Sequence, residues 1–244
     1  MANPTYRREA LEEEFGKLER SSPLVELNVE ADSIITTVGR KAADWLDLQK
    51  TNTLLVNLMS SPGSGKTSLI LQTIAGLKDS LKLGVIEADI DSMVDAEKVA
   101  AKGIRAVQLK TGGFCHLDAT MVTKGIDALS VGDLDLVIIE NVGNLVCPAE
   151  FDTGAHKNVM ILSVPEGDDK PLKYPLMFSI CDVLLVNKMD YLSLSDFDLE
   201  AMRKRVLALN PKIEIIEVSC KTGAGIDQWV GWLKKEVAAF KNLK

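Results

Sequence analysis

The sequence predicts an α/β fold: a mostly parallel central sheet flanked by helices, with a helical extension at the N-terminus. From residue 53 onward, short apolar runs alternate with amphipathic stretches. Strands that are apolar on both faces and alternate with helices indicate a parallel sheet that is covered on both sides. Before residue 50, "REALEEEFGKLER" and "ADSIITTVGRKAADWLDLQ" contain helix formers, spaced apolar positions and no internal proline, which favours helix.

The predicted elements follow one another in a regular order. Residues 7–49 are expected to be helical. The expected strands span residues 53–59, 82–88, 104–109, 134–140, 157–164, 182–188 and 212–218. The expected helices span residues 66–79, 94–102, 117–130, 197–209 and 226–242. Because no repeat or long linker interrupts this order, we divide the chain into a helical N-terminal extension, residues 1–49, and one α/β domain, residues 50–244.

Composition limits the classes of function. The net charge of −7 argues against a nucleic-acid partner, since such proteins carry basic patches. No apolar run approaches the roughly 20 residues of a membrane span, and the charged N-terminus lacks the apolar core of a signal peptide. We therefore expect a cytoplasmic protein with no membrane partner, whose four cysteines are thiols or ligands and not disulfides.

The segment "MSSPGSGKTSLI" follows the first strand of the domain and begins a helix, which is typical of a P-loop. In such a loop, backbone N–H groups bind phosphates, a lysine contacts the β and γ groups, and a hydroxyl ligates Mg²⁺. Lys66 and Thr67 occupy these positions, whereas Ser60 stands where the pattern has glycine. An ordinary Gly/Ser turn is the alternative interpretation. The predicted phosphate contacts are Gly63, Ser64, Gly65, Lys66, Thr67 and Ser68.

Two later segments match loops that bind guanine. "VNKMD" fits N-K-x-D, in which Asp190 accepts from guanine N1–H and the 2-amino group and Lys188 lies along the base plane. Adenine offers neither donor, and such sites discriminate by roughly 10⁴-fold. "SCKTG" resembles the second guanine loop, usually S-A-K. "NKMD" alone also fits a polar turn. The predicted base contacts are Asn187, Lys188, Asp190, Ser219, Cys220 and Lys221.

Carboxylates at strand ends are candidates for Mg²⁺ chemistry. "VIIENVGNL" places Glu140 at a strand end and Gly143 three residues later, the layout for binding Mg²⁺ and contacting a γ-phosphate. After another strand come Asp89, Asp91 and Asp95, which either serve Mg²⁺ or water or cap the next helix. No obvious catalytic glutamine or arginine is visible, so we expect slow intrinsic hydrolysis. The predicted catalytic residues are Lys66, Asp89, Glu140 and Gly143, and the predicted Mg²⁺ ligands are Thr67, Asp89 and Glu140.

"GGFCHLDATM" places Cys115 beside His116, and Cys147 lies four residues after Gly143. If both segments leave neighbouring strand ends, the three side chains meet at one edge of the sheet. Thiolates and imidazole suit Zn²⁺ or Ni²⁺. Three ligands leave a tetrahedral site incomplete, and a two-fold dimer would complete it by pooling both copies. Buried cysteines that act as small hydrophobes are the alternative.

Five segments, "NLMSSPGSGKTSL", "TGGFCHLDATMV", "IIENVGNLVCPAEFD", "EGDDKPLKYPLMF" and "VNKMDYL", together resemble the HypB family, the GTPases that assist nickel insertion into [NiFe]-hydrogenase. The resemblance runs from about residue 30 to the C-terminus. The Cys-Pro-His motif of the similar urease accessory GTPases is absent. The family's P-loop also accepts serine at the position of Ser60.

The resemblance implies a P-loop GTPase that binds GTP or GDP with Mg²⁺. It also implies a nucleotide-dependent homodimer whose interface holds Zn²⁺ or Ni²⁺ through Cys115, His116 and Cys147. Its partners would be the nickel accessory protein HypA and the hydrogenase large-subunit precursor. The chain lacks the family's histidine-rich stretch and N-terminal cysteine cluster, since it has two histidines and its first cysteine is Cys115. We therefore do not expect nickel storage.

Two other functions share part of this pattern. A P-loop kinase of small molecules would contain "GSGKT" but would not need "NKMD" and "SCK", and nucleotide specificity separates it from a GTPase. A metal-storage protein would contain the Cys/His cluster without needing a P-loop, and its metal content would not depend on GTP.

Overall fold

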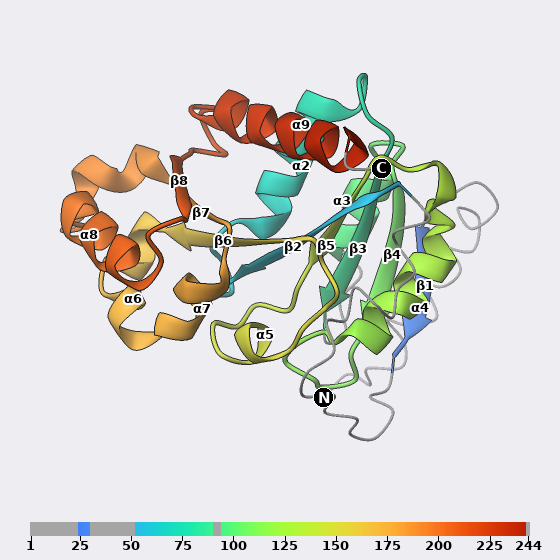
Figure 1. Ribbon diagram of the computed structural model, residues 1–244, viewed down its shortest axis with the longest axis horizontal. Helices are drawn as coiled ribbons and strands as arrows, with labels where there is room; N and C mark the ends of the chain where they lie inside the picture. The colour runs from blue at the N-terminus through green and yellow to red at the C-terminus, as the bar shows by residue number, and fades with distance from the viewer. Residues whose placement is uncertain (1–23, 30–51, 90–93, 243–244) are drawn as a thin grey trace, which may run out of the picture.

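The computed structural model describes residues 24–29, 52–89 and 94–242, which form a single sheet covered by helices (Figure 1). The eight strands are ordered β1-β4-β3-β5-β2-β6-β7-β8, and every pairing among the described residues is parallel. They span β1 (Leu24–Asn28), β2 (Leu54–Ser60), β3 (Leu83–Asp89), β4 (Arg105–Lys110), β5 (Leu136–Glu140), β6 (Lys157–Ser163), β7 (Val183–Asn187) and β8 (Glu214–Glu217). The predicted α/β class and parallel sheet are confirmed.

The described helices match the predicted ones within a few residues, with shorter helices added after β5 and β6. The longer ones are α2 (Lys66–Leu77), α3 (Val94–Ala100), α4 (Ala119–Leu129), α8 (Leu199–Leu209) and α9 (Ile226–Asn242). The shorter ones are α5 (Cys147–Glu150), α6 (Lys170–Lys173) and α7 (Pro175–Ile180), with 3₁₀ turns η3 (Val131–Asp133), η4 (Val164–Glu166) and η5 (Met189–Leu194). No helix among the described residues is both long and apolar enough to cross a membrane.

Apolar side chains on both faces of the strands form the core. On one face, Leu54, Val56 and Leu58 of β2 pack with side chains of α2, α3 and α9. Leu55, between them on the opposite face, packs in the cluster that includes α4, and α7 and α8 pack over β6 and β7. Figure 1 shows α2 and α9 together along one side of the sheet. This two-sided burial explains why β2 reads as a continuous apolar run.

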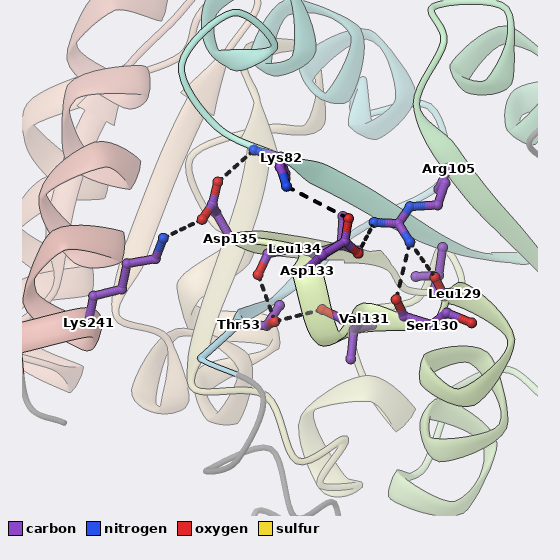
Figure 2. Close-up of polar contacts among 10 residues, drawn as sticks. All are labelled: Thr53, Lys82, Arg105, Leu129, Ser130, Val131, Asp133, Leu134, Asp135 and Lys241. Carbon is purple, nitrogen blue, oxygen red and sulfur yellow. Dashed lines mark hydrogen bonds and ion pairs between the residues drawn. The ribbon is translucent and has the colours of Figure 1, made fainter.

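Polar contacts fix the amino ends of the strands (Figure 2). Arg105, which begins β4, lies 2.5 Å from Asp133 in an ion pair and donates to the Leu129 and Ser130 carbonyls. Asp135 accepts from the Lys82 backbone N–H at 2.7 Å and pairs with a lysine of α9. These contacts hold the edge of the sheet that is opposite the carboxyl ends of the strands.

The prediction of a helix over residues 7–49 is wrong at Leu24–Asn28, which form the edge strand β1 beside β4, and at Val29, which follows the strand and is not helical. Leu24 and Leu27 of β1 are half-buried and pack against the core clusters on opposite faces of the sheet, whereas Val25 and Glu26 are exposed. Glu26 pairs with Lys110 at 2.6 Å. The other predicted helical residues of the extension, 7–23 and 30–49, lie outside the described residues. The domain boundary at residue 50 stays a prediction.

Candidate functional site

The predicted phosphate loop connects β2 to α2 near the middle of the sheet. β2 is flanked by β5 and β6. Strands β3 to β5 lie on one side of β2, and strands β6 to β8 lie on the other. In open parallel sheets, ligands bind at the carboxyl ends of strands where the strand order reverses in this way. Gly63 and Gly65 have φ values of 75° and 104°, which favour glycine. A Cβ at Gly65 would lie 2.5 Å from Asn187 Nδ2, so this glycine also permits close packing.

Ser60, which stands where the P-loop pattern has glycine, contacts the lysine of the loop. Its hydroxyl accepts a hydrogen bond from Lys66 Nζ at 3.1 Å and is fully buried. Burial lowers the pKa of Lys66, whereas the carboxylates of Glu140 and Glu166 act in the opposite direction. The lysine is therefore held in the loop by a hydroxyl and surrounded by acidic groups that favour its charged form.

The predicted base contacts meet beside the phosphate loop. Asn187 donates from Nδ2 to the Ser64 carbonyl at 2.9 Å and accepts from the Cys220 N–H at 3.2 Å. Lys188 Nζ donates to the Gly63 carbonyl at 2.8 Å. The Ser219 hydroxyl lies 2.6 Å from the Asp190 carboxylate. Together they surround a cavity of about 380 Å³, lined by Gly65, Ser68, Pro165, Asn187, Lys188, Asp190, Tyr191, Cys220 and Lys221.

The two loops predicted to bind guanine therefore form one pocket, with the phosphate loop as part of its wall. Asp190 and Lys221 lie 3.8 Å apart at closest approach, and Lys221 also faces the Tyr191 ring at 5.6 Å. Lys188 has a φ of 62°, a backbone conformation that residues other than glycine rarely adopt, and its amine reaches the Gly63 carbonyl of the phosphate loop. This combination of a carboxylate, an amide and a long aliphatic stem fits a purine base.

Thr67 and Glu140 meet next to Lys66, as predicted for a magnesium site. The Thr67 hydroxyl donates to Glu140 Oε1 at 3.0 Å. The buried oxygens Glu140 Oε2 and Glu87 Oε2 receive no hydrogen bond from the described residues. Hydroxyl and carboxylate oxygens are the ligands that Mg²⁺ prefers. The donor set therefore fits Mg²⁺, which when bound would favour the ionised form of the two carboxyl groups.

Glu87 was not predicted as a site residue. It lies on β3 directly opposite Glu140 in the register of β3 and β5. Burial and the neighbouring Glu140 raise the pKa of Glu87 to about 9, and burial also raises the pKa of Glu140, to about 7. The signal in the sequence is a charged residue within the apolar strand "LGVIEAD".

The Glu87 side chain should make stability fall as the pH rises. Its pKa in the folded state, about 9, lies above the ordinary 4.5, so its stabilising contribution is complete below pH 4.5 and is lost as the pH rises to 9. One such proton changes the free energy of unfolding by up to ~1.4 kcal/mol per pH unit. Glu87→Gln should flatten this dependence in urea unfolding of nucleotide-free protein at pH 5, 7 and 9. Glu214→Gln, an exposed control on β8, should not; equal slopes in wild type and Glu87→Gln would contradict the assignment.

Two of the three candidate aspartates, Asp89 and Asp95, are among the described residues. Asp89 ends β3 and is half-buried, and its charge contributes to the raised pKa of Glu87. Asp95 lies in the first turn of α3 and pairs with Lys98 at 2.5 Å. Asp91 lies outside the described residues. Their roles toward Mg²⁺ stay predictions.

Cys115, His116 and Cys147 form one cluster. Their candidate ligand atoms all lie within 4.8 Å of one another, with Cys115 Sγ 2.7 Å from Cys147 Sγ and 3.9 Å from His116 Nδ1. All four cysteines of the chain are free. Burial lowers the pKa of His116, which favours the neutral imidazole that binds metals. Two thiols and a neutral imidazole fit Zn²⁺ or Ni²⁺.

Two local structures place these side chains. After β4, Gly112 and Gly113 adopt φ values of 62° and 109° in the turn that leads to Cys115. Cys147 begins α5, and Asn144 donates to its Sγ at 3.4 Å. The expectation of neighbouring strand ends is wrong, because β3 lies between β4 and β5. The loops after these strands nevertheless reach the same place.

The phosphate loop and the cluster are connected through the segment after β5. Gly143 packs against the loop so closely that a Cβ would lie 3.1 Å from the Pro62 backbone. Cys147 follows four residues later. A further contact that the sequence did not predict comes from Glu166, whose carboxylate accepts from the Ser64 hydroxyl at 2.7 Å and from Ser163 in a capping box. The loop is therefore packed against two neighbouring segments.

Curated proteins similar to this chain are hydrogenase maturation factors. HypB of Escherichia coli is 48% identical over 186 residues, which are 76% of this chain and 64% of that protein. The chain thus spans just under two thirds of the length of that relative. The probable HypB of Methanocaldococcus jannaschii is 38% identical, with 80% of this chain and 88% of that protein covered.

Solved structures agree with this relationship. HypB from Helicobacter pylori, in complex with nickel, has a TM-score of 0.77 and 38% identity, covering 82% of this chain and 94% of the other. HypB from Archaeoglobus fulgidus has a TM-score of 0.76 and 38% identity, covering 81% and 97%. Residues 54–217 match the family described as "CobW/HypB/UreG, nucleotide-binding domain". The chain therefore belongs to the CobW/HypB/UreG family and, within it, to the HypB proteins.

Proposed function

We propose that this protein is a GTP-hydrolysing metallochaperone that assists nickel insertion into [NiFe]-hydrogenase. The observation that carries the proposal is the link between the candidate nucleotide site and the Cys115–His116–Cys147 cluster. Gly143 packs against Pro62 of the phosphate loop, and Cys147 lies on the same short segment. A HypB solved with nickel and the curated hydrogenase maturation factors support the choice of metal and client.

In this proposal, Lys66 and the loop backbone hold the phosphates of GTP, and Asp190 reads the base. Mg²⁺ would be held by Thr67 and Glu140, with Asp89 nearby, and would supply charge for the transferred phosphoryl group. Gly143 would contact the γ-phosphate, and hydrolysis would be slow. The cluster would bind Zn²⁺ or Ni²⁺ at a nucleotide-dependent homodimer interface, where the second copy completes the coordination.

The proposed partners follow from the family. They are the nickel accessory protein HypA, which would supply nickel, and the hydrogenase large-subunit precursor, which would receive it. A metal-storage protein is the main alternative, and its metal content would not depend on the bound nucleotide. Metal analysis of the purified protein with GDP and with a non-hydrolysable GTP analogue, together with its mass in solution, separates the two functions.

Metal affinity should differ between the GTP and GDP states. Cys147 lies on the segment that contacts the phosphate loop. A shift of this segment between nucleotide states should therefore change Ni²⁺ or Zn²⁺ affinity by about 5- to 150-fold, and metal should alter nucleotide affinity by the same factor. Cys147→Ala should remove this difference and keep most of the GTP binding. Cys181→Ala, which changes a buried cysteine outside the cluster, is the matched control. Identical affinities of wild type with GDP, with the analogue and without nucleotide would contradict the metallochaperone proposal.

A further inference from the structure

Three hydrogen-bonded asparagines, two of them buried, form a row across the neighbouring strands β5, β2 and β6. Asn141, which directly follows β5, is fully buried. Its Nδ2 donates to Asn57 Oδ1 of β2 at 3.1 Å, and Asn57 Nδ2 donates to Asn158 Oδ1 of β6 at 3.0 Å. Amides buried among apolar strands are costly unless their hydrogen bonds are made, so satisfied networks fix a specific geometry. The row anchors the Asn141 side chain to the centre of the sheet.

The carbonyl oxygen of the Asn141 side chain holds two backbone segments at once. It accepts from the Val142 N–H at 2.9 Å and from the Leu117 N–H at 3.2 Å. Val142 directly precedes Gly143, the residue packed against the phosphate loop. Leu117 directly follows His116 of the cluster. A single oxygen therefore joins the segment that packs against the phosphate loop to the turn that carries Cys115 and His116.

The sheet itself does not provide this connection. The two segments leave β5 and β4, and β3 separates these strands. Cys147 is joined to Gly143 through the chain, but Cys115 and His116 are not. Hydrogen bonds weaken steeply when their geometry is disturbed. A shift of Val142 that displaces the Asn141 oxygen should therefore weaken the hydrogen bond that this oxygen accepts from the Leu117 N–H.

We propose that Asn141 is a positioning residue that couples the nucleotide state to the positions of Cys115 and His116. The proposal rests on the proposed function, because it explains how two of the three cluster residues respond to the nucleotide. The residue contacts neither nucleotide nor metal in this role and acts through the backbone of its neighbours. Without its oxygen, the two segments should respond independently.

The test is Ni²⁺ titration of the full chain with GDP and with a non-hydrolysable GTP analogue. In Asn141→Ala, the ratio of the two affinities should fall to within about threefold of one, against the 5- to 150-fold typical of coupled sites. Asn158→Ala removes the far end of the row and leaves the two bonds to the Asn141 oxygen in place. This control should keep the wild-type ratio.

A second measurement on the wild type does not depend on any variant folding. Amide hydrogen exchange of Leu117, without metal, should differ between the GDP and analogue states, and the difference should persist in Asn158→Ala. Suppose that the metal affinity of the wild type depends on the nucleotide. The role of Asn141 alone is then overturned if folded Asn141→Ala keeps the wild-type ratio of affinities, or if Leu117 exchanges equally in the two nucleotide states. A wild type whose metal affinity ignores the nucleotide overturns the proposed coupling itself.

Discussion

Lys66→Ala is expected to reduce GTP hydrolysis by at least about 100- to 1,000-fold, the usual cost of removing one charge-stabilising donor from a reaction site. Lys66 begins α2 at the end of the phosphate loop, and its amine is held by the Ser60 hydroxyl at 3.1 Å. The β and γ oxygens of a nucleotide bound in this loop carry the charge that the amine would neutralise. Alanine leaves that charge without its partner.

The substitution also changes the carboxyl groups nearby. The lysine charge lowers the pKa of Glu140, against the effect of burial, which raises it. Without Lys66, the Glu140 carboxyl should hold its proton to higher pH and should become a poorer acceptor for the Thr67 hydroxyl and a poorer Mg²⁺ ligand. Loss of activity should therefore be accompanied by weaker Mg²⁺ binding, which a Mg²⁺ titration would show as a higher concentration needed for half-maximal hydrolysis.

The measurement is phosphate release under single-turnover conditions at saturating GTP and Mg²⁺. The fold should remain intact, which circular dichroism and urea unfolding can check. Lys78→Ala, an exposed lysine at the end of the same helix, should hydrolyse GTP at the wild-type rate. A Lys66→Ala protein that is as active as wild type would refute the assignment of the phosphate loop.

The sequence was informative wherever local pattern decides structure. The strands β2 to β8 are apolar runs bounded by polar residues, so their positions agree with expectation within a few residues. The phosphate and base loops are contiguous motifs, and their side chains do meet around one cavity. The edge strand β1 was missed because "LVELN" is short and lies among residues with helical composition.

Contacts that depend on strand order could not be predicted from the sequence. Glu87 faces Glu140 because β3 pairs with β5, and no local pattern specifies that pairing. Asn57 and Asn158 are 101 positions apart. Asn57 looks like an isolated polar residue in an apolar strand, and Asn158 looks like part of the polar start of another. Even the Cys115–His116–Cys147 cluster was expected for a partly wrong reason, since a strand separates β4 from β5. The residue types predicted the chemistry of the cluster, whereas long-range packing decided its geometry.

Asp190→Asn should change the preferred base from guanine to xanthine. The carboxylate lies in the pocket with one oxygen 2.6 Å from the Ser219 hydroxyl and the other 3.8 Å from Lys221 Nζ. Guanine presents N1–H and a 2-amino group, two donors that pair with two carboxylate acceptors. Asparagine offers one acceptor and one donor, and its oxygen can still accept from Ser219, so the pocket should keep its shape.

The expected loss of GTP affinity is large because a buried donor of guanine would face another donor. Sites built around such hydrogen bonds discriminate by about 10⁴-fold or more. Xanthine has a carbonyl at the 2-position, which accepts from the new amide, so XTP should bind Asp190→Asn more tightly than GTP does. Competition of GTP, XTP and ATP against a fluorescent nucleotide measures the change, with the exposed Asp196→Asn as control. If Asp190→Asn keeps its preference for GTP, or if wild type binds or hydrolyses ATP as well as GTP, Asp190 does not recognise the base. The pocket would then suit a P-loop kinase of small molecules better than a GTPase.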